Sequence, residues 1–141
     1  MMRREVYDRL GGLPEDRFMY GEDLEYCARA RQAGFKVGYI PRALVLHYLS
    51  GSRSDYARWV ESYTEATLDY YRRHGTASAR ARVSHFVRLG SALRGLLWSS
   101  VGLLRPALRP QAKMRCEGYR RAAALAVLYH PRNEGRGLPA A

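Results

Sequence analysis

The sequence predicts an α/β fold class for the first half of the chain and amphipathic α-helices for the second half. Residues 22–33 and 55–74 carry the periodicity and end signals of helices. Between them, residues 35–40 and 44–48 are short apolar runs bounded by glycine, proline or polar residues, which is typical of strands. From residue 79, apolar residues recur at helical spacing among arginines. With 141 residues, 47% of them hydrophobic, the chain can bury a core.

Glycines mark the N-terminal elements. A short helix over residues 3–10 should end at Gly11-Gly12, and a turn follows. An apolar segment and a further glycine lead into Glu22, where the next helix starts, because acidic residues are favoured at the positive end of the helix dipole. Gly34 is the natural cap at the end of that helix. Pro41 separates the two predicted strands and argues against one long central strand.

The helix predicted over residues 55–74 has cap signals at both ends, Ser54 or Asp55 before it and Gly75 after it. One face carries residues at spacings of three and four, namely Tyr56, Trp59, Tyr63, Thr67, Tyr70 and His74. The other face is charged and carries Arg58, Glu61, Glu65, Asp69 and Arg73. The two faces together predict an amphipathic helix.

An apolar stripe follows, made of Phe86, Leu89, Leu93, Leu96, Leu97, Val101 and Leu104. Arginines interrupt it, so that no apolar run reaches the about 18 residues of a membrane-spanning helix. Pro106 and Pro110 should end this helix, and a shorter one is expected over residues 117–129.

Charge is divided unevenly along the chain. Residues 1–70 contain 10 Lys and Arg and 11 Asp and Glu, whereas residues 71–141 contain 14 and 2. We therefore predict a balanced domain over residues 1–78, a basic helical extension over residues 79–130 and a flexible tail over residues 131–141.

The basic extension is suited to an anionic partner, although a GC-rich genome would also account for the arginine excess. A basic amphipathic helix is typical of a segment that lies on an anionic membrane surface. One alternative is that the stripe packs on the first domain as core. Nucleic-acid binding is the weakest alternative, because base-stacking aromatic residues are scarce in the extension and no known motif occurs there. We therefore predict a membrane surface and no nucleic acid as partner.

The two cysteines, Cys27 and Cys116, form no CxxC pattern, so neither a disulfide framework nor a zinc site is expected. A reducing compartment follows as the default. The first residues have no apolar segment of a signal peptide. We therefore expect a cytoplasmic protein.

Glu22 and Asp23 are the first candidates for chemistry. A carboxylate at a loop-to-helix junction is fixed in direction and open to a cleft, as a general base must be. Two acids in a first turn also simply cap a helix, and taken alone this is the commoner reason for them. His47 interrupts an apolar run and therefore needs a hydrogen bond or a metal, the first being commoner.

The spacing of these residues resembles the C-terminal half of the catalytic domain of family 2 glycosyltransferases, above all the rhamnosyltransferase-type members that build bacterial surface polysaccharides. The resemblance covers about residues 3–75. It rests on Arg4-Glu5, Gly11-Gly12-Leu13, Glu15, Phe18-Met19-Tyr20, Glu22-Asp23, Arg29, Gly34-Phe35, Val37, Tyr39, Pro41 and His47. It implies half of a GT-A-type domain that transfers a hexose such as rhamnose from a nucleotide sugar to a polysaccharide or lipid-linked acceptor.

The resemblance also implies roles for single residues. Asp23 is implied as the general base with Glu22 beside it, and His47 as a ligand of the divalent metal, Mg²⁺ or Mn²⁺, that carries the nucleotide diphosphate. Tyr20 could stack on an acceptor ring or serve as a core aromatic residue. Ser52 and Arg53 could close over the phosphates or belong to a solvated loop.

One part of the family pattern is absent. The nucleotide-binding half of such enzymes carries an Asp-x-Asp motif, and this sequence contains none. We therefore expect a fragment with little or no transferase activity of its own, which would act with a separate N-terminal half at the inner face of the cell membrane as a peripheral protein. The competing interpretation is a non-catalytic relic that binds membranes through its basic helices.

Overall fold

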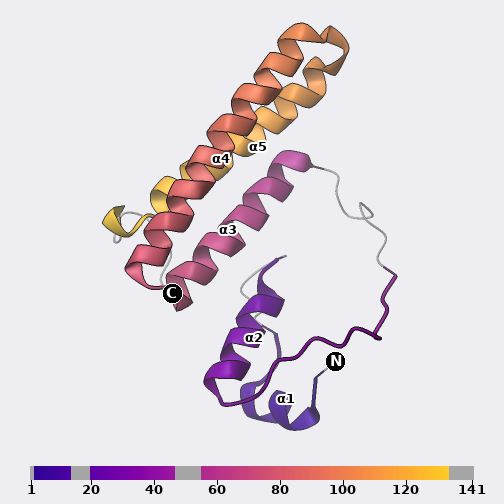
Figure 1. Cartoon of the computed structure of the whole chain (residues 1–141), viewed down its shortest axis with the longest axis vertical. Helices are drawn as coiled ribbons and strands as arrows, with labels where there is room; N and C mark the ends of the chain where they lie inside the picture. Colours follow the sequence, from indigo (N-terminus) through magenta and orange to yellow (C-terminus); the bar gives the residue numbers. More distant parts are fainter. Residues whose placement is uncertain (1, 14–19, 47–54, 134–141) are drawn as a thin grey trace. The chain divides into compact units, whose positions relative to one another are not determined.

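The chain forms two compact units, residues 1–52 and 53–141. The structure, a computed structural model, describes residues 2–13, 20–46 and 55–133 (Figure 1). Within those ranges every regular element is helical.

The first unit contains α1, Arg4–Leu10, and α2, Glu22–Gln32. The glycine signals act as the sequence predicts. Gly11 ends α1 with a φ of 74° and donates its N–H to the carbonyl of Tyr7 at 2.7 Å. After α2, Gly34 has a φ of 86°, and the next N–H reaches back to the carbonyl of Ala30 at 2.9 Å. Gly34 also donates its own N–H to the carbonyl of Arg31 at 3.0 Å. The left-handed residue and these two hydrogen bonds form a Schellman motif, which only glycine forms without steric cost.

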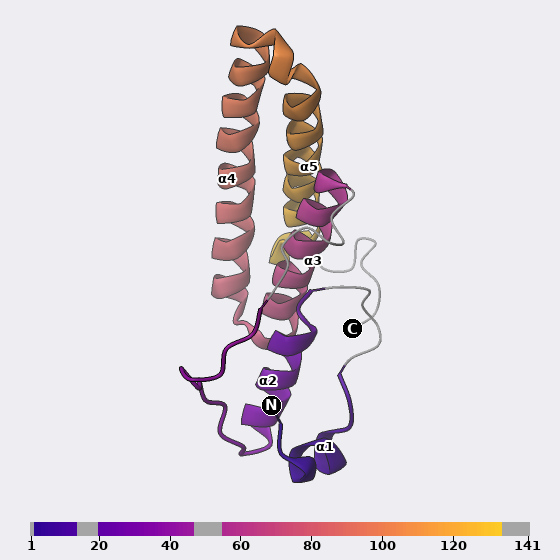
Figure 2. The same ribbon diagram turned by 90° about the vertical axis from the view of Figure 1, so that its right-hand side faces the viewer.

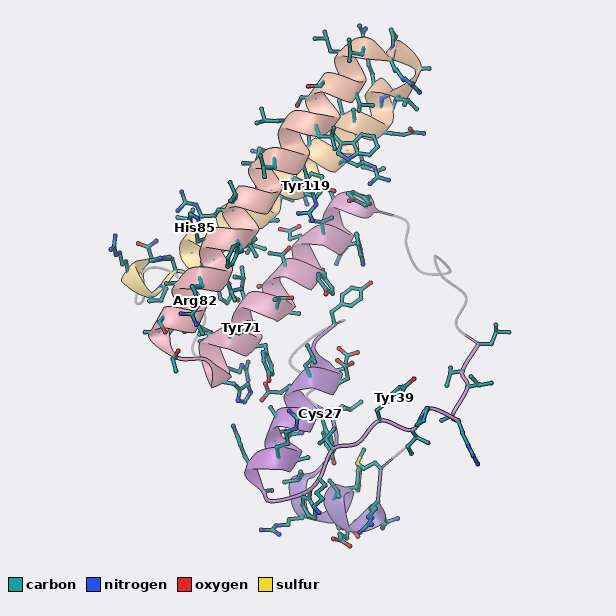
Figure 3. All side chains as sticks on the ribbon, in the orientation of Figure 1. Cys27, Tyr39, Tyr71, Arg82, His85 and Tyr119 are labelled. Carbon is teal, nitrogen blue, oxygen red and sulfur yellow. The ribbon has the colours of Figure 1, made fainter. Side chains whose placement is uncertain are left out.

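The predicted α/β fold class is wrong for the described part of the chain. Residues 35–40, expected as a strand, form no regular secondary structure, and neither do residues 44–46 of the second expected strand. A strand is held by hydrogen bonds to a neighbouring strand, and no such neighbour lies among the described residues. Tyr39, labelled in Figure 3, is accordingly 89% exposed, and Leu44 is 93% exposed.

The second unit contains α3, Tyr56–His74, α4, Ala77–Leu104, and α5, Arg109–Leu128. Short 3₁₀ turns at Pro106–Leu108 and Pro131–Asn133 follow α4 and α5. Figures 1 and 2 show α4 and α5 lying side by side as a hairpin, with α3 along one end of it. No helix in the described ranges combines the length and apolarity needed to cross a membrane.

The start of α5 differs from the prediction. The sequence predicts a helix from residue 117, with Pro110 as a stop signal, but α5 begins at Arg109. Pro110 occupies the first turn of α5, where the missing N–H has no intrahelical partner to lose. The proline therefore starts a helix instead of ending one.

The helical unit is packed through small side chains. A methyl group added at Gly118 of α5 would lie 3.1 Å from the Cα of Ala57 in α3, and one added at Gly102 of α4 would lie 2.9 Å from the Cβ of Ala112 in α5. The buried cluster at the other end of the hairpin consists of Leu68, Ala126 and Tyr129, flanked by Val83, Val87 and Leu125. At Gly102 and Gly118 the helices therefore approach too closely for any side chain larger than hydrogen.

Candidate functional site

The predicted acidic pair lies at a strained junction. Tyr20 has a φ of 74° and Gly21 a φ of 85°, so two consecutive residues are left-handed immediately before α2. For Tyr20 this conformation costs on the order of 1–3 kcal/mol, and such strain is concentrated at functional sites. Glu22 and Asp23 then form the first helical turn together with Glu25. The backbone conformation of Tyr20 and Gly21 thus determines where α2, and with it the carboxylates of Glu22 and Asp23, is placed.

The two carboxylates have different surroundings. Asp23 is exposed, and its Oδ1 accepts the N–H of Leu24 at 2.8 Å. Its other oxygen has no hydrogen bond within the described residues and is open to a ligand. Glu22 is half-buried, and its Oε2 is buried without a hydrogen-bond partner in the described part of the chain. A buried carboxylate oxygen of this kind is costly unless a proton, a cation or a ligand hydroxyl satisfies it.

Side chains of α2 hold the preceding glycine turn. Arg29 donates from Nη2 to the carbonyl of Gly12 at 2.7 Å and from Nη1 to that of Leu10 at 3.3 Å. Tyr26 donates its hydroxyl to the carbonyl between them, that of Gly11, at 3.1 Å, and the Arg29 guanidinium lies 5.1 Å from the Tyr26 ring centre. Three consecutive carbonyls are thus bound by one helix face, which ties the turn to the helix that carries Asp23.

The sequence predicted Gly11-Gly12 as the end of the first helix and included Arg29 in the family pattern without a role, and the part played by Tyr26 was not predicted. The available signal was spacing, since Tyr26 and Arg29 are three residues apart and lie on one helix face. Of the predicted site residues, Tyr20, Glu22 and Asp23 are consecutive or nearly so at the junction. His47, Ser52 and Arg53 lie outside the described residues.

The metal prediction depends on His47. Within residues 2–13, 20–46 and 55–133, no three His, Cys, Asp or Glu side chains come together as a cation site. Mg²⁺ and Mn²⁺ bind through several oxygen or imidazole ligands, and the carboxylates of Glu22 and Asp23 alone do not supply such a set. No step of the chemistry below is therefore assigned to a metal.

Comparison with known proteins adds a family match. The family model described as "Glycosyltransferase like family 2" matches residues 1–81. The N-acetylglucosaminyl-diphospho-decaprenol L-rhamnosyltransferase of Mycobacterium tuberculosis is 31% identical over 98 residues, which is 69% of this chain and 32% of that protein. The rhamnosyltransferase WbbL of Escherichia coli K12 is 28% identical over 81 residues, which is 57% of this chain and 31% of that protein.

The chain thus spans about a third of the length of the curated relatives it matches. No solved structure matches it. The family match includes the junction before α2, the carboxylates of Glu22 and Asp23, and the whole of α3.

Proposed function

Because this chain belongs to glycosyltransferase family 2, we propose that it carries the acceptor side of a hexosyltransferase, with Asp23 as the general base. The observation that carries the proposal is the junction before α2. It presents an exposed carboxylate with one oxygen bound to a backbone N–H, beside a second carboxylate with a buried oxygen; neither the second Asp23 oxygen nor the buried Glu22 oxygen has a hydrogen-bond partner among the described residues.

The reaction we propose is a displacement at the anomeric carbon of the donor sugar. An acceptor hydroxyl forms the new C–O bond while its proton passes to the free oxygen of Asp23. The bond between the sugar and the nucleotide diphosphate breaks, and the diphosphate leaves with the electron pair. Such a single displacement inverts the anomeric configuration. Glu22 would lie beside the base, and Tyr20 would stack on the acceptor ring.

For the substrates we propose a rhamnose or a related hexose as donor sugar, carried by a nucleotide, and a lipid-linked saccharide or a polysaccharide as acceptor. The names of both relatives support rhamnose, and the name of the Mycobacterium tuberculosis relative supports an acceptor on a diphospho-decaprenol carrier. An acceptor of this kind lies at a membrane. We therefore propose a cytoplasmic protein that is peripheral on the inner face of the cell membrane.

The donor diphosphate needs groups that these 141 residues lack, since no Asp-x-Asp occurs among them. We propose that a separate N-terminal half supplies them, with a divalent cation for which His47 is one ligand. Ser52 and Arg53 would contact the phosphates from the same segment. On this proposal the chain has little or no transferase activity when it is alone.

A second candidate is a non-catalytic membrane-binding module. The observation that favours it is the exposed apolar face of α4, which has leucines such as Leu96, 67% exposed, in the most basic part of the chain. The two candidate functions differ in whether the carboxylates of Glu22 and Asp23 take part in catalysis.

Reconstitution tests the proposed function. The purified chain is combined with the nucleotide-binding half of a family 2 rhamnosyltransferase, and transfer from dTDP-rhamnose to an N-acetylglucosaminyl-diphospho-lipid is measured. We expect transfer by the combination and none by either half. Transfer by the chain alone would remove the need for a second half, and a folded, associated pair without any transfer would favour the binding module.

A further inference from the structure

Helix α4 has two faces of opposite character. Small residues face inward, and Ser84, Ser91 and Gly102 are buried. The bulky apolar residues point outward and are 48–78% exposed: Phe86, Leu89, Leu93, Leu96, Leu97, Leu103 and Leu104. At 3.6 residues per turn these seven residues fall within an arc of roughly 120°. The outer face of α4, as we name this set, is therefore a largely apolar surface in which Ser100 is an exposed polar residue of the same arc.

Positive charge surrounds the outer face. Helix α4 contains no Asp or Glu, and residues 71–141 contain only Glu117 and Glu134. Hydrogen bonds from Arg121 at 2.8 Å and from Arg120 at 2.7 Å hold the pKa of the Glu117 carboxyl below its usual value. Arg82, labelled in Figure 3, and Arg94 of α4 form no ion pair with any described residue. The apolar surface therefore lies on a helix with at least two arginines, Arg82 and Arg94, that no described carboxylate neutralises.

We propose that the outer face of α4 docks in the plane of an anionic phospholipid bilayer. Its Phe and Leu side chains would enter the boundary between headgroups and acyl chains, and arginines such as Arg82, Arg94 and Arg105 would reach the lipid phosphates. This docking proposal depends on the proposed function in one respect, namely that a lipid-linked acceptor would place the enzyme at a membrane. It adds which helix face makes the contact and how the α4–α5 hairpin lies.

The main competing occupant is a second copy of the chain. Phe86, Leu89, Leu93 and Leu96 alternate at spacings of three and four, a pattern that also suits a coiled coil. Coiled coils are stabilised by opposite charges beside the seam, whereas α4 offers only basic residues and would place like charges together. An anionic bilayer complements the same charges, and this complementarity favours lipid over a second copy.

Vesicle co-sedimentation of the full chain tests the proposal, using phosphatidylcholine vesicles with and without phosphatidylglycerol at low and high salt. We expect binding that requires phosphatidylglycerol and weakens as salt is raised. The variant L89Q/L93Q/L96Q should reduce binding by about tenfold or more while circular dichroism stays unchanged, because these side chains are exposed. The control M114Q/V127Q/L128Q changes three exposed apolar residues of α5 and should bind like the unmodified chain.

Three results would overturn the proposal. One is failure of the unmodified chain to bind anionic vesicles at low salt. Another is equal binding by the α4 and α5 variants. The third is a dimer in analytical ultracentrifugation that L89Q/L93Q/L96Q dissociates without any change in vesicle binding, which would assign the face to a second copy. Since vesicle binding is measured without any sugar donor, these outcomes are independent of the transferase proposal.

Discussion

Each of the two units is stabilised internally by a different kind of contact. In the first unit, α1 and α2 are joined by polar contacts, above all those of Arg29 and Tyr26 with three backbone carbonyls. In the second, α3, α4 and α5 pack mainly through small side chains and the Leu68, Ala126 and Tyr129 cluster, although Glu61 and Arg121 also join α3 to α5 at 2.9 Å. The difference suggests a division of labour, since directional hydrogen bonds fix the orientation of a few groups whereas close packing mainly stabilises a scaffold.

The family match runs across this division. It covers residues 1–81 and therefore includes the first unit and α3, but it ends at the start of α4. The carboxylates and the tied glycine turn fall within the match, whereas the exposed apolar face lies beyond it. The family model thus covers the candidate site and does not cover the outer face of α4.

The largest stability effect is expected in the core of the helical unit. Leu68 is 3% exposed and lies beside Ala126 and Tyr129, so Leu68→Ala should lower the free energy of unfolding by about 2–5 kcal/mol. Leu96→Ala is the matched control, because Leu96 is 67% exposed and should cost less than about 0.5 kcal/mol. Thermal unfolding followed by circular dichroism measures both. Equal losses would mean that the outer face of α4 is itself packed.

Close approach of α3 and α5 is tested by adding one carbon. Gly118→Ala places a methyl group 3.1 Å from the Cα of Ala57, and this overpacking should destabilise the unit by about 1–3 kcal/mol. Gly95→Ala adds the same methyl group to α4, where no atom lies within 4 Å. It should stabilise the helix by up to about 1 kcal/mol, since alanine is the better helix former. Urea unfolding of both variants should give shifts of opposite sign, and a gain from Gly118→Ala would refute the packing described here.

A smaller and local loss of stability is expected when the hydrogen bonds of Arg29 in the first unit are altered. Arg29→Lys keeps the charge but loses the forked contact with two carbonyls, which should weaken the turn by about 1 kcal/mol. Amide exchange at Gly11 should become about fivefold faster. Arg31→Lys is the control on the exposed side of α2 and should leave that exchange unchanged. Unfolding of the helical unit should not respond to either variant, and a shift there would show that the two units share one cooperative transition.

The sequence predicted the parts of the fold that local rules determine. Helix ends at Gly11, Gly34 and Asp55 were recognisable because positive φ and side-chain capping have residue preferences; Asp55 accepts the N–H groups of Ala57 at 2.9 Å and Arg58 at 3.2 Å. The prediction of strands at residues 35–40 and 44–48 was wrong because a strand depends on pairing with another strand, which a local sequence pattern does not reveal. The predicted start of α5 was wrong because proline is found both after helix ends and in the first turn of helices.

The sequence predicted where the candidate site lies but not the contacts and backbone strain around it. Glu22 and Asp23 could be found from their place at a helix start, and Tyr20 from its place beside them. The strain at Tyr20, the burial of a Glu22 oxygen and the hydrogen bonds of Tyr26 and Arg29 to three carbonyls depend on the three-dimensional arrangement. The roles of His47, Ser52 and Arg53 stay predictions, because those residues lie outside the described ranges.

The most direct test of the central claim, that Asp23 is the base, is the transfer rate of the reconstituted enzyme with Asp23→Asn, measured together with donor binding. Asparagine keeps the shape and the capping oxygen but cannot accept the proton, so transfer should fall by about 10²–10⁴-fold while the donor Kd stays unchanged. Asp8→Asn, which alters an exposed carboxylate paired with Arg4 at 2.9 Å, should leave transfer unchanged. Undiminished transfer by Asp23→Asn, or a loss of donor binding in place of transfer, would contradict the assignment.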